Sequence, residues 1–122
     1  VATRILGFVN APTLQQKMVV RCLNEQTDIS YYDRNRETLY NGLLECGFEC
    51  IKPEGAFYLF VKSPIEDEKA FCAAAKKYNI LIVPGSSFGC PGYVRMAYCV
   101  AYETIVNSLP EFKKLAAEFG LA

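Results

Sequence analysis

The chain has 122 residues, of which 52% are hydrophobic and 21% charged, and its 13 basic residues balance its 13 acidic residues. This composition is typical of one folded domain, and the lack of a basic surplus argues against nucleic acid or a membrane as the main partner. The apolar runs are too short to cross a bilayer and no signal-peptide pattern is present, so we expect a soluble protein, and its localisation is expected to be cytoplasmic.

Two helices are predicted in the first part of the chain. Asn10 and Pro12 are typical of a helix start, and apolar residues at helical spacing extend that helix to about Asn24. A second helix is expected to begin near Thr27 or Asp28 and to end at Gly47. Its predicted buried stripe consists of Ile29, Tyr32, Leu39, Leu43 and Cys46.

The pattern then changes to short strands. Strands are predicted over residues 48–52 and 56–62, on either side of a Pro-Glu-Gly turn. The sequence Ser-Pro-Ile-Glu at residues 63–66 resembles a capping box and predicts a helix to about Tyr78. A brief strand over residues 80–83, a glycine-rich loop and a strand around Arg95 follow. The last segment is helical, with Pro110 either kinking or restarting it.

The order of these elements indicates an α+β fold, in which a small antiparallel or mixed sheet of about four short strands is covered by helices. No repeat or linker interrupts the pattern, so residues 1–122 are expected to form a single domain.

Six cysteines and no histidine limit the chemistry that this chain can perform. The chain is not small and loop-rich, and several cysteines lie on apolar helix or strand faces, so we expect buried free thiols in a reducing cytoplasm. Because neither a Cys-x-x-Cys pair nor a histidine is present, we expect no metal site. Without imidazole, neither a Ser-His nor a Cys-His nucleophile can be assembled. The residues therefore predict a binding site with no catalytic group.

Arg95 is the first candidate for that site, since it lies in an apolar strand directly after the glycine-rich loop. A guanidinium in such surroundings needs an anionic partner, and its planar fork matches a carboxylate or a phosphate. Two readings stay open at this point: Arg95 binds a small anionic ligand, or it pairs with an internal Asp or Glu or reaches the surface.

Gly55 and Ala56 are the second candidate, because they follow a turn and precede a run of aromatic residues. Small residues there would let a ligand approach the backbone, so they could form a pocket wall. The alternative reading is that they only begin a core strand.

Three motifs in this order carry a resemblance to a known family: PEGAFYLF from Pro53, VPGSSFG from Val83 and GYVR from Gly92. From about Asn10 to its end, the chain resembles the C-terminal part of a pyridoxal-phosphate-dependent aminotransferase of the aspartate aminotransferase superfamily (fold type I, class I/II). The resemblance implies that Arg95 binds the α-carboxylate of an amino-acid substrate and of its 2-oxo acid product. It also implies a small domain that closes against an upstream large domain, in a homodimeric parent.

The same resemblance implies that pyridoxal phosphate is bound by the full-length parent and not by this chain. The Schiff-base lysine and the other cofactor ligands of the family precede this region, so the fragment alone is expected to be inactive. Residues 1–10 are interpreted as a leftover connecting segment.

Two alternatives stay open beside this reading. A stand-alone α+β module that binds an amino acid or a similar carboxylate for regulation would account equally well for Arg95 and the glycine loop. A lyase or decarboxylase relative would share the same domain. The identity of the amino acid is not predicted.

Overall fold

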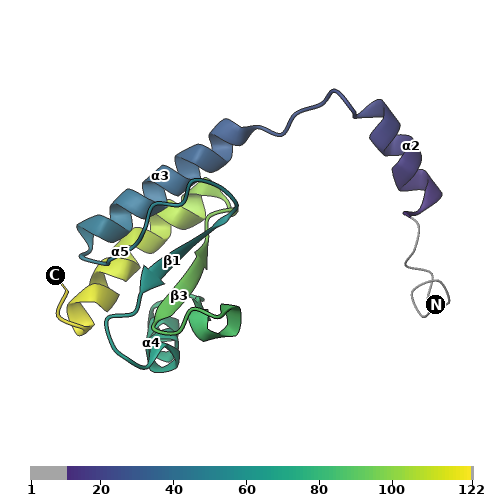
Figure 1. The fold of residues 1–122 in the computed structure, drawn as a ribbon. Coiled ribbons are helices and arrows are strands. Elements are labelled where there is room, and N and C mark those ends of the chain that lie inside the picture. Colours follow the sequence, from purple (N-terminus) through teal and green to yellow (C-terminus); the bar gives the residue numbers. More distant parts are fainter. Residues whose placement is uncertain (1–10, 122) are drawn as a thin grey trace, which may run out of the picture.

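The computed structural model describes residues 11–121, and residues 1–10, interpreted above as a connecting segment, lie outside them. The described part contains four α-helices, a three-stranded sheet and two short 3-10 turns (Figure 1). In chain order these are α2 (Thr13–Arg21), α3 (Ile29–Glu45), β1 (Tyr58–Lys62), α4 (Glu68–Ala75), η1 (Lys76–Tyr78), β2 (Val83–Pro84), η2 (Gly85–Phe88), β3 (Tyr93–Ala97) and α5 (Tyr102–Glu118).

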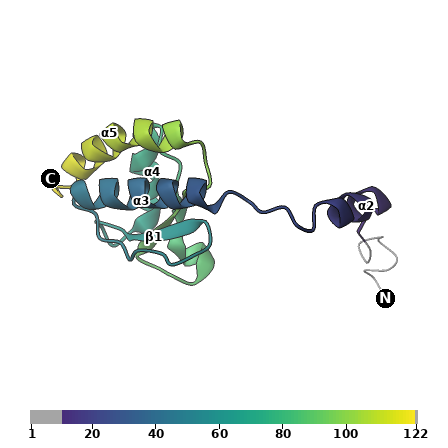
Figure 2. The same cartoon turned by 90° about the horizontal axis from the view of Figure 1, so that it is seen from above.

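Helix α2 stands apart from the rest of the described chain, to which an extended segment joins it (Figures 1 and 2). The helix is where the spacing predicted one, with Pro12 just before its first turn. It has no buried residue, and Leu14, Met18 and Val20 of this helix are all more than half exposed. Within residues 11–121, no other segment therefore covers the apolar side chains of this helix.

Helices α3 and α5 lie side by side and cover the sheet (Figures 1 and 2). Asp28 caps α3 by accepting a hydrogen bond from the backbone N–H of Tyr31, and Gly47 follows the helix with a φ of 86°. A Cβ at Gly42 would collide with the side chain of Leu109, so this glycine permits the close approach of the two helices.

The buried face of α3 differs from the predicted stripe at its first turn. Leu39, Leu43 and Cys46 are buried as expected, but Ile29 is 75% exposed. The beginning of α3 extends beyond the sheet and helix α5 (Figure 1). Asn35 is instead fully buried, and its side-chain amide donates to the backbone carbonyls of Tyr98 and Val100 at 3.0 and 2.8 Å. These two hydrogen bonds connect α3 to the segment that follows β3.

The sheet is antiparallel with the order β1-β3-β2, so β3 is its central strand. The α+β class is confirmed, but there are three strands rather than about four. Residues 48–52 form only an isolated bridge between Cys50 and Val61, and the strand expected at residues 80–83 is reduced to Val83–Pro84. Proline at 53 and 84 explains part of this, since neither can donate to a ladder.

Helix α4 begins later than predicted. Its N-cap is Asp67, whose carboxylate accepts from the backbone N–H groups of Lys69 and Ala70, so the capping box at residues 63–66 was wrong. The backbone N–H of Ser63 is bonded instead to the carbonyl of Gly92 at 2.9 Å. The helix passes into η1, which ends as predicted at Asn79 in the left-handed conformation.

Alternate residues of the strands point into one core beneath the helices. The core contains Leu59 and Val61 of β1 and Val94 and Met96 of β3, together with buried residues of α3, α4 and α5. Helix α5 runs through Pro110 as one element, so the proline does not restart it, and a kink there stays a prediction. The remaining residues of the strands lie on the opposite face of the sheet, which stays partly or fully exposed.

Candidate functional site

Arg95 projects from the exposed face of the sheet, at the middle of its central strand. Its neighbours Val94 and Met96 point into the core, so alternation along β3 places Arg95 on the other side. Across the strands it is opposite Phe60 of β1 and Val83 of β2. The side chain is half-buried, so part of it remains accessible to solvent.

Two aromatic rings contact the guanidinium of Arg95. Its Cζ lies 4.2 Å from the ring centroid of Tyr58 and 3.7 Å from that of Phe88. Both distances are well within the range of cation–π attraction. Neither Tyr58 nor Phe88 was a predicted site residue, although both lie inside the motifs PEGAFYLF and VPGSSFG.

Arg95 has no carboxylate partner within residues 11–121. Each ion pair found there involves another cation, and none of the hydrogen bonds between side chains in this range involves Arg95. The two buried side-chain atoms without a partner in this range are Oδ1 of Asn35 and Nε of Arg36, so the nitrogens of Arg95 are not sealed from solvent. The expectation of an internal Asp or Glu partner finds no support in this range.

The glycine-rich loop before β3 is held tightly against the sheet. A Cβ at Gly85 would overlap the backbone carbonyl oxygens of Cys90 and Tyr93, so only glycine fits this position. Glu68 of α4 accepts a hydrogen bond from the backbone N–H of Gly92 at 3.2 Å. A hydrogen bond with the Ser86 side chain, and then the one from Gly92, lower the pKa of the Glu68 carboxyl. These contacts fix the loop that carries Phe88.

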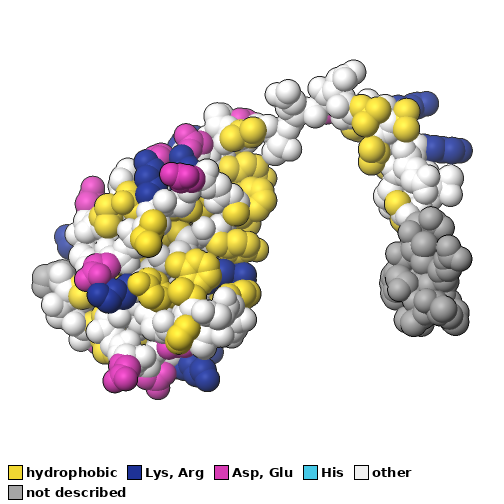
Figure 3. Space-filling view, in the orientation of Figure 1, with side chains coloured by type: hydrophobic (Ala, Val, Ile, Leu, Met, Phe, Trp, Pro, Cys, Tyr) yellow, Lys and Arg dark blue, Asp and Glu magenta, His cyan; other side chains and the backbone are white. Residues whose placement is uncertain are grey.

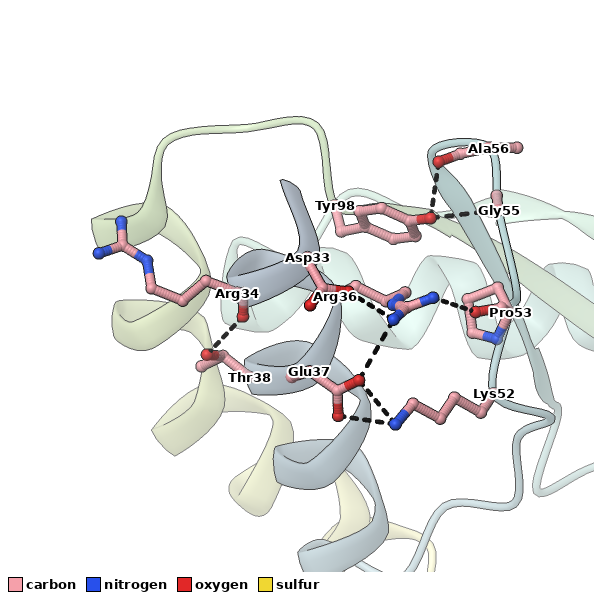
Figure 4. Close-up of polar contacts among 10 residues, drawn as sticks. All are labelled: Asp33, Arg34, Arg36, Glu37, Thr38, Lys52, Pro53, Gly55, Ala56 and Tyr98. Atoms are coloured by element: carbon pink, nitrogen blue, oxygen red, sulfur yellow. Dashed lines mark hydrogen bonds and ion pairs between the residues drawn. The ribbon is translucent and has the colours of Figure 1, made fainter. Parts of the chain in front are cut away.

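Gly55 and Ala56 form a turn that Tyr98 braces. The Tyr98 hydroxyl donates to the carbonyl oxygens of Ala56 at 2.6 Å and Gly55 at 3.2 Å (Figure 4), and Ala56 has a φ of 62°. A Cβ at Gly55 would meet no atom within 4 Å, so this backbone is open on its outer side.

The same turn lines a pocket of about 330 Å³ at the beginning of α3. Tyr32, Arg36 and Phe57 are among its other lining residues, whereas Arg95 is not. The two predicted candidates, Arg95 and the Gly55–Ala56 turn, therefore do not line the same pocket. Tyr58 follows the turn closely in sequence, and its ring contacts Arg95. Their joint role as one substrate pocket stays a prediction.

The described residues do not fit pyridoxal phosphate. Every lysine of the chain is exposed, and Lys52, Lys62, Lys77 and Lys114 are paired with glutamates at the surface. A Schiff-base lysine requires a lowered pKa. Hydrogen bonds with Glu49 and Glu118 instead raise the pKa of Lys62 and Lys77 respectively.

The six cysteines are all free, as predicted. Burial raises the pKa of the thiols of Cys46, Cys50 and Cys72, which disfavours the reactive thiolate. Within residues 11–121 no group of three potential metal-binding side chains comes together. In the same range, none of the helices has the length and apolar character needed to cross a membrane.

Comparison with known proteins agrees with this architecture. The family model for aminotransferase class I and II matches residues 2–109. Aromatic-amino-acid aminotransferase 2 of Thermococcus litoralis and an aspartate aminotransferase of Pyrococcus abyssi are each 36% identical to this chain over 92 residues, which is 71% of this chain and 24% of each relative. This chain therefore spans about a quarter of the length of these curated relatives.

A solved amino transferase from Eubacterium rectale is similar over almost the whole chain. It superimposes with a TM-score of 0.87 and 49% identity, covering 97% of this chain and 30% of the other. On these grounds, the chain belongs to the class I and II aminotransferase family.

Proposed function

We propose that this chain is the C-terminal domain of a longer pyridoxal-phosphate-dependent aminotransferase, in which Arg95 binds the α-carboxylate of the substrate. The parent would transfer an amino group between an amino acid and a 2-oxo acid. Membership of the family and the span of about a quarter of its relatives support this proposal. Residues 1–10 would connect the domain to the large domain upstream.

One observation carries the assignment of Arg95. Its guanidinium is half-buried on an uncovered sheet face, and its donors have no carboxylate partner in the described residues. A structural arginine would satisfy these donors within the chain, because an unpaired buried cation is costly. Donors that are positioned but unused are suited to a ligand carboxylate, which accepts two parallel hydrogen bonds from one guanidinium.

The other predicted residues would have supporting roles. The backbone of Gly55 and Ala56 would form part of the wall beside the substrate, and the rigid loop from Gly85 would define its opposite side. Pyridoxal phosphate, when bound to the parent, supplies an electron sink for the α-carbon. Residues upstream of this chain would hold it, since no lysine here has the required environment.

The names of the relatives bear on the substrate class. They include aspartate and aromatic-amino-acid aminotransferases, and both types of substrate carry the α-carboxylate that Arg95 would bind. We further propose that the parent is a cytoplasmic homodimer and that this domain closes on the substrate. Closure would bring Arg95 to the carboxylate and exclude water from the reacting centre.

A labelling experiment tests the division of work between this chain and the rest of the parent. The full-length protein is incubated with pyridoxal phosphate, reduced with borohydride and mapped by mass spectrometry of its peptides. A phosphopyridoxyl group on a lysine that precedes residue 1 is the expected result. Labelling of a lysine within residues 1–122 only, or of no lysine, would overturn the proposal.

The exposed donors of Arg95 also favour a second candidate, a stand-alone module that binds an amino acid or similar carboxylate for regulation. This function requires no upstream domain and no cofactor. Calorimetric titration of the 122-residue chain with aspartate, phenylalanine and alanine distinguishes the two functions. Measurable heat that Arg95→Met abolishes supports the module, whereas the aminotransferase proposal predicts no useful affinity because most of the pocket would be missing.

A further inference from the structure

The guanidinium of Arg95 lies between rings from two different elements. Tyr58 belongs to β1, and Phe88 is the last residue of η2. Their centroids are 4.2 and 3.7 Å from Cζ of Arg95. Among the described residues the two rings form no aromatic pair with each other, as expected when a third group separates them.

The register of the sheet places the first ring. Phe60 is directly opposite Arg95 in the β1–β3 pair, so Tyr58 is the diagonal neighbour on the same face. Diagonal neighbours are within reach of long and aromatic side chains. A shift of one residue would turn Tyr58 to the core face and leave Arg95 without this contact.

The glycine loop places the second ring. Gly85 approaches the carbonyls of Cys90 and Tyr93 too closely for any side chain, and Glu68 holds the far end of the loop through Gly92. Phe88 lies between these two attachments and is 47% exposed. The ring therefore contacts Arg95 because the loop is fixed on both sides, and not because the ring is itself packed in the core.

We propose that Tyr58 and Phe88 are positioning residues, which hold the guanidinium of Arg95 ready for the substrate carboxylate. The inference rests on the proposed function of Arg95. The two rings contact the guanidinium at its central carbon Cζ, which carries no hydrogen, whereas the five N–H donors are on the nitrogens around it. An aromatic pair can therefore restrain the arginine without occupying the donors that a carboxylate needs.

This arrangement differs in its consequences from an ion pair. An arginine held by an internal carboxylate would have to break that bond, or share it, when substrate arrives. An arginine held by rings keeps its donors free while its long side chain is already ordered, which removes part of the entropic cost of binding. The rings also displace water from the guanidinium faces, which strengthens the interaction with a carboxylate.

A purely structural role for the rings is the competing explanation. Tyr58 and Phe88 are 41% and 47% exposed, so the core does not depend on either of them. The same exposure makes substitution tolerable, and variants at both positions are expected to fold. The two explanations differ in what happens when Arg95 is removed, because positioning residues act only through it.

The test uses the full-length holoenzyme and two pairs of variants. Phe88→Leu and Tyr58→Leu remove a ring but keep an apolar side chain, while Phe88→Tyr and Tyr58→Phe retain the ring as matched controls. Each is measured for KM and kcat with its best amino acid, and for the Kd of maleate and of 3-phenylpropionate by calorimetry. Phe88→Leu is then repeated in an Arg95→Met background.

We expect each leucine variant to raise KM and the Kd of the better-bound carboxylate by about 5- to 30-fold, which corresponds to about 1–2 kcal/mol. The effect on kcat should be smaller, and the controls should remain within about twofold of the unmodified protein. In the Arg95→Met background, Phe88→Leu should have almost no further effect, because the coupled group is already absent.

Two results would overturn the inference, and they are distinguishable. In the first, Arg95→Met raises KM strongly, but Phe88→Leu raises KM by the same factor with and without Arg95, or the leucine variants leave KM and Kd unchanged. The rings then do not act through Arg95, while the proposed function stands. If Arg95→Met itself leaves KM and both Kd values unchanged, the proposed function fails and the inference fails with it.

Discussion

Two arginines of the described chain, Arg36 and Arg95, have contrasting environments. Arg36 of α3 donates to the carbonyl of Pro53 at 2.8 Å and pairs with Asp33 and Glu37 (Figure 4). Arg95 on the sheet face contacts two rings and no carboxylate of the described chain. The contacts of Arg36 connect α3 to the segment around Pro53 and so stabilise the fold. The contacts of Arg95 are with aromatic rings, and its N–H donors have no carboxylate partner in the described chain. The partners of an arginine, rather than its burial, therefore separate a structural residue from a candidate binding residue.

Replacement of Arg95 is expected to have the largest effect, and it falls on activity. Arg95→Lys in the full-length enzyme should reduce kcat/KM for amino acids by about 10²- to 10³-fold, because a bidentate charge pair of this kind contributes about 2–5 kcal/mol. Steady-state kinetics provide the measurement. Arg34→Lys is the matched control, since Arg34 also stacks on an aromatic ring, at 4.0 Å from Tyr102, but outside the proposed site. Equal losses in both variants would contradict the assignment.

Gly85→Ala should have the next largest effect and should act on stability. The new Cβ would overlap two backbone carbonyl oxygens, which cannot move as a flexible side chain could, so we expect a loss of about 3 kcal/mol. Urea unfolding of the chain measures the change. Gly55→Ala is the control, because a Cβ there meets no atom within 4 Å, and it should be nearly neutral. A neutral Gly85→Ala would show that the loop is not held against β3 as described.

Arg36→Met sharpens the comparison between the two arginines. It removes the hydrogen bond to Pro53 and the pairs with Asp33 and Glu37, so the free energy of unfolding should fall by about 1–2 kcal/mol. The same substitution at Arg95 should change the free energy of unfolding by less than about 0.5 kcal/mol, as for other residues outside structural networks. The reverse order in urea titrations would exchange the two roles.

Acid should weaken the attachment of the glycine loop by a smaller amount. Hydrogen bonds with Ser86 and Gly92 lower the pKa of Glu68 in the folded chain. The stabilisation is therefore complete above the ordinary glutamate pKa of about 4.3, and it is lost as the pH falls through the lowered folded value. Urea unfolding between pH 6 and pH 3 should show a stability difference between the unmodified chain and Glu68→Gln that shrinks toward low pH. A difference independent of pH would exclude this role of the carboxylate.

The sequence allowed the site to be anticipated only where the chemistry is local. Arg95 could be singled out because a cation in an apolar strand needs an explanation, and the glycine loop because its composition predicts a tight turn. The Tyr58 contact depends on strand register, and that of Phe88 depends on where the loop is attached, so neither follows from local pattern. Arg36 shows the same limit, since its bond to Pro53 joins segments that only the fold brings together.

The fold was predictable to a similar degree and for similar reasons. Helix α3 has its N-cap at Asp28, one of the two predicted positions, and its last residue is Glu45, just before the glycine predicted to stop it at position 47, because both signals are local. Ile29 was assigned to the core since it continues the apolar spacing, yet its side chain is 75% exposed, and in the first turn the two tyrosines after it make the contacts instead, Tyr32 with Phe57 and Tyr31 with the carbonyl of Val100. Apolar side chains also reach the surface of α2 and of the body (Figure 3), where periodicity alone would have buried them.

The separation of α2 from the sheet and helices α3–α5 has a consequence for hydrogen exchange in this chain. A helix of nine residues with no buried residue is only marginally stable in water. Its few backbone hydrogen bonds do not offset the unfavourable free energy of forming the first turn. Its amide hydrogens should exchange with solvent at nearly the rate of an unstructured peptide, while those of α3 are protected by the core. Slower exchange at Leu14 and Met18 would therefore report directly that another surface has engaged this helix.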